Sequence, residues 1–176
     1  GGEVDVVRFD WQMALLRECC HPMSLAEGVD GLKRGALPPR AVAVTFDDGY
    51  ADNATIALPI LLKHAIPATF FIAPGFLDGG RMWNDSVIEA VRRAPGDSVE
   101  TGFVGLGVLP LSGVEARSQI ADQIIKAVKH LPTEQRSALV AEFCARIGAE
   151  LPTDLMMTRE QVRSLAAAGM EIGAHT

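Results

Sequence analysis

Two aspartates and a histidine directly follow two predicted strands of the chain. Asp47 and Asp48 come after residues 41–46, and His175 comes after residues 170–174. Successive side chains on a strand point to opposite sides, so two adjacent aspartates at a strand end need not share one task. One carboxylate can bind a divalent cation while the other accepts a proton. This combination activates water for hydrolysis.

Each of these residues also has a purely structural interpretation. Asp and Gly are common turn formers, so Asp47-Asp48-Gly49 taken alone is equally consistent with a turn. A lone histidine such as His175 is more often structural than catalytic. Trp83 is a candidate platform for stacking a sugar, but a packed aromatic residue is the commoner case. The other histidines follow no predicted strand, and we interpret them as structural or surface residues: His21, His64 and His130.

The elements around Asp47 and Asp48 predict an α/β fold. Residues 41–46 are almost wholly apolar, which predicts a strand buried on both faces. A helix is expected over 52–64, where Pro59 limits the regular part, and a second buried strand over 68–72. A strand, a helix and a strand within about 30 residues form a βαβ unit. Reacting groups gather at the carboxyl ends of parallel strands, so both candidate segments stand where chemistry is expected.

Capping signals locate the helices outside this unit. Capping boxes are predicted at 24–27, 112–115 and 158–161, and Asp10 is a candidate N-cap for the first helix. Gly169 stands where a residue ending the last helix belongs. Residues 80–153 are interpreted as a mostly helical insertion, within which 94–112 is rich in glycine and has no clear assignment.

Composition bounds the class of protein. The chain has 176 residues, 48% of them hydrophobic and 22% charged, which is typical of a globular domain. The formal net charge is -6 and there is no basic tract, so we expect no nucleic-acid partner. No apolar run approaches the length of a membrane span. Three cysteines, two of them adjacent, make a poor disulfide framework, which favours the cytoplasm over a secreted or periplasmic location.

The amino-acid sequences of three segments resemble motifs of the polysaccharide deacetylase family. This family is also described as the chitooligosaccharide-deacetylase homology domain and is similar to carbohydrate esterase family 4. The segments are Thr-Phe-Asp-Asp-Gly-Tyr at 45–50, Leu-Pro-Ile-Leu followed by Ile-Pro-Ala-Thr-Phe-Phe within 58–71, and residues 157–176. The resemblance covers roughly 40–77 and 154–176. It implies a distorted, often incomplete (β/α) barrel. It also implies metal-dependent removal of acetyl groups from N-acetylated or O-acetylated sugars of a polysaccharide or its precursor.

The resemblance also assigns roles to individual residues. Asp47 corresponds to the catalytic base, and Asp48 and His175 correspond to two metal ligands, while Thr176 matches the small hydroxyl residue that follows the histidine. The implied cofactor is a divalent metal, zinc first, with cobalt, nickel or manganese as alternatives. The implied enzyme is a hydrolase acting on carbon–nitrogen bonds other than peptide bonds, and its partner is an acetylated glycan. No substrate-binding residue is assigned. The insertion resembles that of a bacterial subgroup.

The family's second metal histidine and its later motifs would lie beyond Thr176. We therefore expect residues 1–176 to be a single, C-terminally incomplete deacetylase domain with its insertion at about 80–153. With two metal ligands instead of three, this segment alone is expected to be inactive. An incomplete barrel has open strand edges, which predicts self-association through those edges.

Three other functions fit parts of the pattern. A relative with the same fold could hydrolyse a non-sugar amide, in some cases without a metal. A glycan-binding module could keep the fold without catalysis. A phosphatase of the haloacid dehalogenase kind is disfavoured, because its two aspartates stand two residues apart and those of this chain are adjacent.

Overall fold

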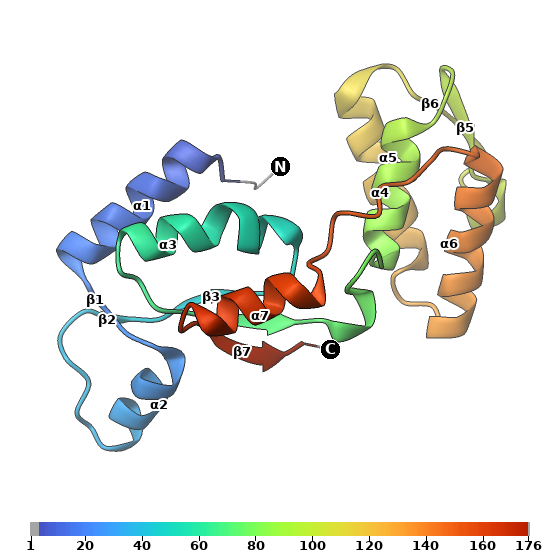
Figure 1. Ribbon diagram of the computed structural model, residues 1–176. Coiled ribbons are helices and arrows are strands. Elements are labelled where there is room, and N and C mark those ends of the chain that lie inside the picture. Colours follow the sequence, from blue (N-terminus) through green and yellow to red (C-terminus); the bar gives the residue numbers. More distant parts are fainter. Residues whose placement is uncertain (1–3, 176) are drawn as a thin grey trace. The chain divides into compact units, whose positions relative to one another are not determined.

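The computed structural model describes residues 4–175 and divides into two compact units. The first unit comprises residues up to Gly80 together with those from Asp154 onward, and the second comprises Arg81–Thr153 (Figure 1). Asp47, Asp48 and His175 all belong to the first unit. No helix in the described part of the chain is both long and apolar enough to cross a membrane.

A three-stranded parallel sheet forms the centre of the first unit. It consists of β3 (Val44–Phe46), β4 (Ala68–Ile72) and β7 (Glu171–Ala174), with β4 in the middle. Phe70 of β4 is in register with both neighbouring strands. The parallel pairing of β3 and β4 confirms the predicted βαβ unit and the α/β class of the fold. Within residues 4–175 the sheet is open and does not close into a barrel.

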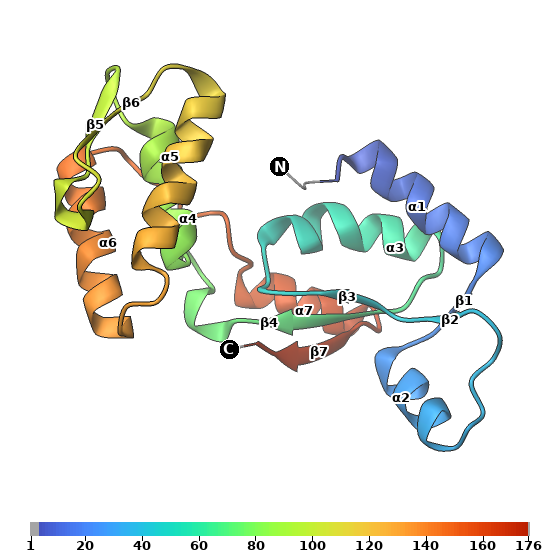
Figure 2. The ribbon, with the colours of Figure 1, turned by 180° about the vertical axis from the view of Figure 1, so that it is seen from behind.

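Three helices contribute to the hydrophobic core on one face of this sheet. They are α1 (Val6–Cys19), α3 (Leu58–Lys63) and α7 (Arg159–Ala167), seen from opposite sides in Figures 1 and 2. Leu61, Phe70 and Leu165 are fully buried there. Each such side chain stabilises the fold by about 1.5–3 kcal/mol relative to an exposed position. The core therefore fixes the sheet whose edge carries the candidate residues.

The helix that follows Asp47 and Asp48 has an irregular start. A π-helical turn, η1 (Asn53–Ala57), leads into α3, and Pro59 lies near the first residue of α3. Proline lacks the N–H that would bond to the carbonyl of residue 55, and its ring crowds that carbonyl. The wider π turn avoids this conflict, which confirms that Pro59 limits the regular part of the helix.

The prediction of Asp10 as the first helix's N-cap was wrong. Asp5 is the N-cap, and its side chain accepts a hydrogen bond from the backbone N–H of Arg8. Asp10 lies one turn inside α1, where its carboxylate accepts hydrogen bonds from the Lys63 ammonium group and meets the His64 ring, both at 2.8 Å. Asp10 therefore links α1 to the end of α3.

The prediction of one buried strand over 41–46 was also wrong. Two short strands occupy the segment, because each half has a different partner. β2 (Ala41–Val42) pairs with β1 (His21–Pro22), whereas β3 pairs with β4. Thr45 is exposed, so β3 is not buried on both faces. Between β1 and β2 lies α2 (Leu25–Lys33), which begins at the predicted capping box of Ser24 and Glu27.

The second unit is helical with a small antiparallel hairpin. Its helices are α4 (Trp83–Arg93), α5 (Gly113–Val128) and α6 (Thr133–Ile147), and they share one hydrophobic core. The hairpin consists of β5 (Ser98–Glu100) and β6 (Val108–Pro110), in the glycine-rich segment that sequence patterns left unassigned. Ser112 stands at the N-cap of α5 without a side-chain capping bond, so the capping box predicted there was wrong. Two short 3-10 turns complete the list of elements, Pro74–Phe76 in the first unit and Gly102–Val104 in the second.

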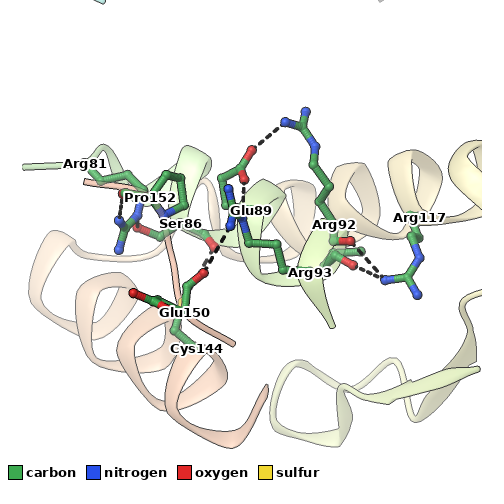
Figure 3. Close-up of polar contacts among 10 residues, drawn as sticks. Arg81, Ser86, Glu89, Arg92, Arg93, Arg117, Cys144, Glu150 and Pro152 are labelled. Carbon is green, nitrogen blue, oxygen red and sulfur yellow. Dashed lines mark hydrogen bonds and ion pairs between the residues drawn. The ribbon is translucent and has the colours of Figure 1, made fainter. Parts of the chain in front are cut away.

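Arginine side chains tie the second unit together (Figure 3). The Arg117 guanidinium donates to the carbonyl oxygens of Val91 and Ala94 at 2.6 and 3.0 Å. It thereby supplies hydrogen-bond donors to backbone carbonyls at the C-terminal end of α4. The nearly buried carboxylate of Glu89 pairs with both Arg92 and Arg93. These contacts stabilise α4 and involve none of the three candidate residues.

Candidate active site

The carboxyl edge of the parallel sheet holds the candidate residues. Asp47 and Asp48 follow β3, and His175 follows β7. The backbone N–H of Ala73 donates to the Asp48 carbonyl at 3.0 Å, and the N–H of His175 donates to the Ile72 carbonyl at 2.8 Å. The end of the central strand β4 therefore positions both outer segments.

These backbone bonds bring two side chains together. Nδ1 of His175 lies 3.7 Å from Oδ1 of Asp48, and about one third of each side chain is exposed, 37% and 33%. A carboxylate and an imidazole at this separation form an ion pair when the histidine is protonated. They also offer one oxygen and one nitrogen ligand toward the same exposed space.

The backbone at Asp48 and Gly49 has an uncommon conformation. Asp48 has φ +70° and Gly49 has φ +89°, and both values lie in the left-handed region. Aspartate is one of the few residues other than glycine that enter this region with modest cost. Strain of this kind persists only where the surroundings impose it, and it is often found at functional sites.

Glycine is required at position 49 for a second reason. A Cβ atom there would lie 3.2 Å from Cγ2 of Ile72 and 3.5 Å from Cε of Met157. The Gly49 carbonyl also accepts a hydrogen bond from the N–H of Met157 at 2.9 Å. The loop after β3 is therefore clamped between the end of β4 and the segment that precedes α7.

Asp47 differs from Asp48 in its surroundings. It is exposed, and within residues 4–175 its carboxylate makes no ion pair and no hydrogen bond. Its backbone carbonyl accepts from the N–H of Gly49 at 2.8 Å, which fixes the turn but not the side chain. Asp47 therefore stands beside the Asp48–His175 pair with a carboxylate available to a bound molecule.

The Asp48–His175 pair has the donor chemistry of a divalent-metal site. Carboxylate oxygen and imidazole nitrogen each bind zinc at about 2.0–2.2 Å, so two ligands of one ion lie within roughly 4.4 Å of each other. The 3.7 Å separation satisfies this condition. No group of three or more His, Cys, Asp or Glu side chains with metal-binding geometry occurs in the described residues. The residues present therefore fit as two ligands of such an ion.

The remaining candidates lie elsewhere. His64 contacts Asp10, His21 is exposed on β1, and His130 is exposed at the end of α5. Trp83 packs against the core of the second unit, and the Arg136 guanidinium lies 4.8 Å from its ring centre. This packing supports the structural interpretation of Trp83. Thr176 lies outside the described residues.

Sequence reasoning passed over Asn53. It is a buried polar residue at the start of η1, and it shares an inward-facing row with the buried residues Ala57, Ile60 and Leu61. A polar residue at a helical spacing otherwise filled by apolar residues was the signal that could have identified it.

Comparison with known proteins yields one family and two described structural relatives. The model of the family described as polysaccharide deacetylase matches residues 34–176. The deacetylase domain of BpsB from Bordetella bronchiseptica is 22% identical, with a TM-score of 0.45, over 94% of this chain and 42% of that one. A de-N-acetylase from Aggregatibacter actinomycetemcomitans is 20% identical, with a TM-score of 0.44, over 96% of this chain and 41% of that one. The chain thus spans about two fifths of either relative. No curated protein sequence matches it.

Proposed function

The chain belongs to the polysaccharide deacetylase family, and from this membership we propose that it contributes the catalytic edge of a metal-dependent sugar deacetylase. The substrate class is an N-acetylated, or O-acetylated, sugar of a polysaccharide or its precursor. For an N-acetyl group the reaction breaks the amide C–N bond, adds water across it, and releases acetate and a free amine.

One observation carries the proposal. Asp48 and His175 come from separate strands and meet at 3.7 Å at the carboxyl edge of a parallel sheet, with the exposed Asp47 adjacent in sequence. In parallel α/β folds this edge is where reacting groups gather. A turn that only connects β3 to the next helix would require neither His175 beside it nor an aspartate with positive φ at position 48.

Each residue has a distinct task in this proposal. Asp47 acts as general base and takes a proton from the attacking water, because its carboxylate is exposed and unpaired within the described residues. Asp48 and His175 hold a divalent ion, zinc first, with cobalt, nickel or manganese as alternatives. When bound, such an ion supplies Lewis-acid polarisation of the acetyl carbonyl. The clamped loop around Gly49 keeps Asp47 and Asp48 in fixed positions relative to each other.

The fold supports an architectural proposal as well. We interpret β3, β4 and β7 as part of a distorted, incomplete (β/α) barrel, with Arg81–Thr153 as a helical insertion into a single deacetylase domain. Both outer strands of the sheet have an edge unpaired within residues 4–175. Such edges are able to pair with another strand, either of the same protein or of a second copy.

Acetate release by the complete protein tests the function. We expect acetate from N-acetylglucosamine oligosaccharides, loss of release after chelation, and restoration by adding a divalent ion. Release that survives chelation would favour a metal-free amide hydrolase. Glycan binding without acetate release, in protein reloaded with metal, would favour the non-catalytic glycan-binding module.

A further inference from the structure

Asp78 lies in the loop after β4 and has a backbone conformation that favours glycine. Its φ is +59°, in the left-handed region, and the next residue, Gly79, has φ +97°. A side chain in this region costs backbone energy that glycine avoids, and such strain persists only where the surroundings impose it. An aspartate rather than a second glycine at position 78 therefore points to a task for its side chain.

The contacts of Asp78 reach a segment about 80 residues further along the chain. Its backbone N–H donates to the Met157 carbonyl at 3.1 Å. One carboxylate oxygen accepts from the backbone N–H of Arg159, 81 residues away, at 2.9 Å, and the other lies 3.0 Å from the Arg159 guanidinium. Arg159 is the first residue of α7, and the first N–H groups of a helix have no partner within it. Asp78 therefore holds both Met157 and the beginning of α7.

Met157 connects Asp78 to the loop after β3. Its N–H donates to the Gly49 carbonyl at 2.9 Å, and its buried side chain places Cε 3.5 Å from where a Cβ on Gly49 would lie. The Leu155 carbonyl also accepts from the N–H of Ala51 at 2.8 Å, so the two segments lie side by side. Because Gly49 directly follows Asp48, the position of Met157 helps to set the position of both aspartates.

The loop after β3 is thus held from two sides. The central strand holds one side, since the N–H of Ala73 donates to the Asp48 carbonyl at 3.0 Å. The other side depends on Met157, which lies outside the three strands of the sheet. The ion pair of Asp78 with Arg159 adds little to this second hold, because the two side chains are 37% and 71% exposed. The hydrogen bonds of Asp78 are therefore the contacts that matter.

We propose that Asp78 is a positioning residue for Asp47 and Asp48, acting through Met157 and Gly49 without touching a reacting atom. The consequence for metal binding rests on the proposed function, whereas the hold on the loop rests on the hydrogen bonds alone. Removing a residue that orients a metal ligand typically lowers metal affinity by about 10–100-fold. Loss of the Asp78 carboxylate should therefore weaken metal binding at Asp48.

Three variants separate this role from a general effect on folding. Asp78→Gly isolates the carboxylate, because glycine keeps the left-handed backbone and removes only the side chain. Asp78→Asn keeps an oxygen acceptor for the N–H of Arg159. Ser24→Gly is the matched control, since the Ser24 hydroxyl accepts from the N–H of Glu27 at 3.2 Å at the beginning of α2, away from the residues that hold the loop.

Native-state amide hydrogen exchange on the metal-free complete protein measures the hold directly. The N–H of Met157 reports its bond to Gly49, and the N–H of Phe70, fully buried in β4, reports unfolding of the whole unit. We expect Asp78→Gly to speed exchange at Met157 relative to Phe70 by about tenfold, and Asp78→Asn and Ser24→Gly to change this ratio by less than about twofold. An Asp78→Gly ratio equal to that of the unsubstituted protein would overturn the proposal.

Zinc titration of the same variants tests the consequence for the ligands. We expect Asp78→Gly to lower zinc affinity by about tenfold and Ser24→Gly to leave it unchanged. Faster exchange at Met157 with unchanged zinc affinity, in a protein whose affinity Asp48→Ala does lower, would overturn the positioning role. If the unsubstituted protein binds no zinc, the metal proposal is wrong, and the exchange ratio alone decides whether Asp78 positions the loop.

Discussion

Asp48 and His175 belong to segments far apart in the sequence, yet the end of one strand fixes the position of both. The Asp48 carbonyl accepts a hydrogen bond from the N–H of Ala73, and the N–H of His175 donates one to the Ile72 carbonyl, so the last residue of β4 and the residue after it set their spacing. Backbone hydrogen bonds to the end of β4 therefore place the two residues next to each other, and their side chains lie 3.7 Å apart. Ligands that are preorganised by backbone bonds lose little entropy when they bind.

Removal of either proposed ligand should weaken metal binding. We expect Asp48→Ala and His175→Ala each to reduce zinc affinity by more than about tenfold, since even outer-sphere changes cost that much. Isothermal titration of the metal-free complete protein measures this. Asp122→Ala and His130→Ala, at exposed positions of the second unit, are the matched controls and should change nothing. Equal affinities for all four variants would place the metal elsewhere.

Asp47→Asn should separate turnover from binding. A general base acts mainly in the transition state, so we expect kcat to fall by about 10²–10⁴ with glycan affinity nearly unchanged. Acetate release at saturating substrate measures the first quantity, and a binding titration measures the second. Asp122→Asn is the control. A variant that loses affinity but keeps its turnover number would assign Asp47 to substrate binding instead.

Gly49→Ala should destabilise the fold more than Gly35→Ala. Both glycines have positive φ, +89° and +63°, so each substitution costs about 1–2 kcal/mol of backbone strain. A Cβ at Gly49 also crowds Ile72 at 3.2 Å, whereas at Gly35 no described atom lies within 4 Å. We expect about 1 kcal/mol of additional loss at Gly49, measured by urea unfolding. Equal losses in the free energy of unfolding would mean that the Ile72 side chain can move away from the new Cβ at no energetic cost.

The Thr69–Glu171 hydrogen bond should make stability depend on pH. The Thr69 hydroxyl donates to the Glu171 carboxylate at 2.6 Å, and this bond is the main reason that the pKa of Glu171 is below its ordinary value of 4.5. A carboxyl group whose pKa is lower in the folded state than in the unfolded state stabilises the fold in full when the pH is above the unfolded-state pKa. This stabilisation is lost as the pH falls through the folded-state pKa. At pH 7 the bond is therefore present in full.

Thr69→Val should remove this contribution while keeping the shape of the side chain. We expect a loss of about 1–3 kcal/mol at pH 7 that shrinks as the pH falls below 4.5. Thr45→Val is the matched control, because Thr45 is exposed and is the register partner of Thr69 on β3. Denaturant unfolding at several pH values gives both curves. A loss that is independent of pH would show that packing, and not the carboxylate, governs the effect.

The sequence predicted local features well where one residue type has one physical role. The capping boxes at Ser24 and Thr158 are present, and Gly169 has the expected positive φ, +84°. The placement of Asp47, Asp48 and His175 at strand ends was also correct, because apolar runs ending in polar residues are typical of parallel strands.

Features that depend on tertiary partners escaped prediction. The split of 41–46 into two strands depends on β1 and β4, which local sequence does not reveal. Aspartate is a common N-cap residue, but Asp5 and not Asp10 occupies the N-cap position of α1. The Asp10 carboxylate instead contacts Lys63 and His64. A cavity lies between the beginning of α1, Phe46 and η1, and because its lining depends on how these segments pack, the spacing of residues in the sequence could not predict it.

The chain leaves the first unit and returns to it at adjacent points. The N–H of Asp78 donates to the Met157 carbonyl at 3.1 Å, and the Asp78 carboxylate pairs with Arg159 at 3.0 Å. The entropy of closing a loop grows only slowly with its length, so the stretch between these anchors can lengthen, shorten or be exchanged at little cost to the sheet. A change in the length of Arg81–Thr153 would therefore leave in place the backbone bonds that position Asp48 and His175.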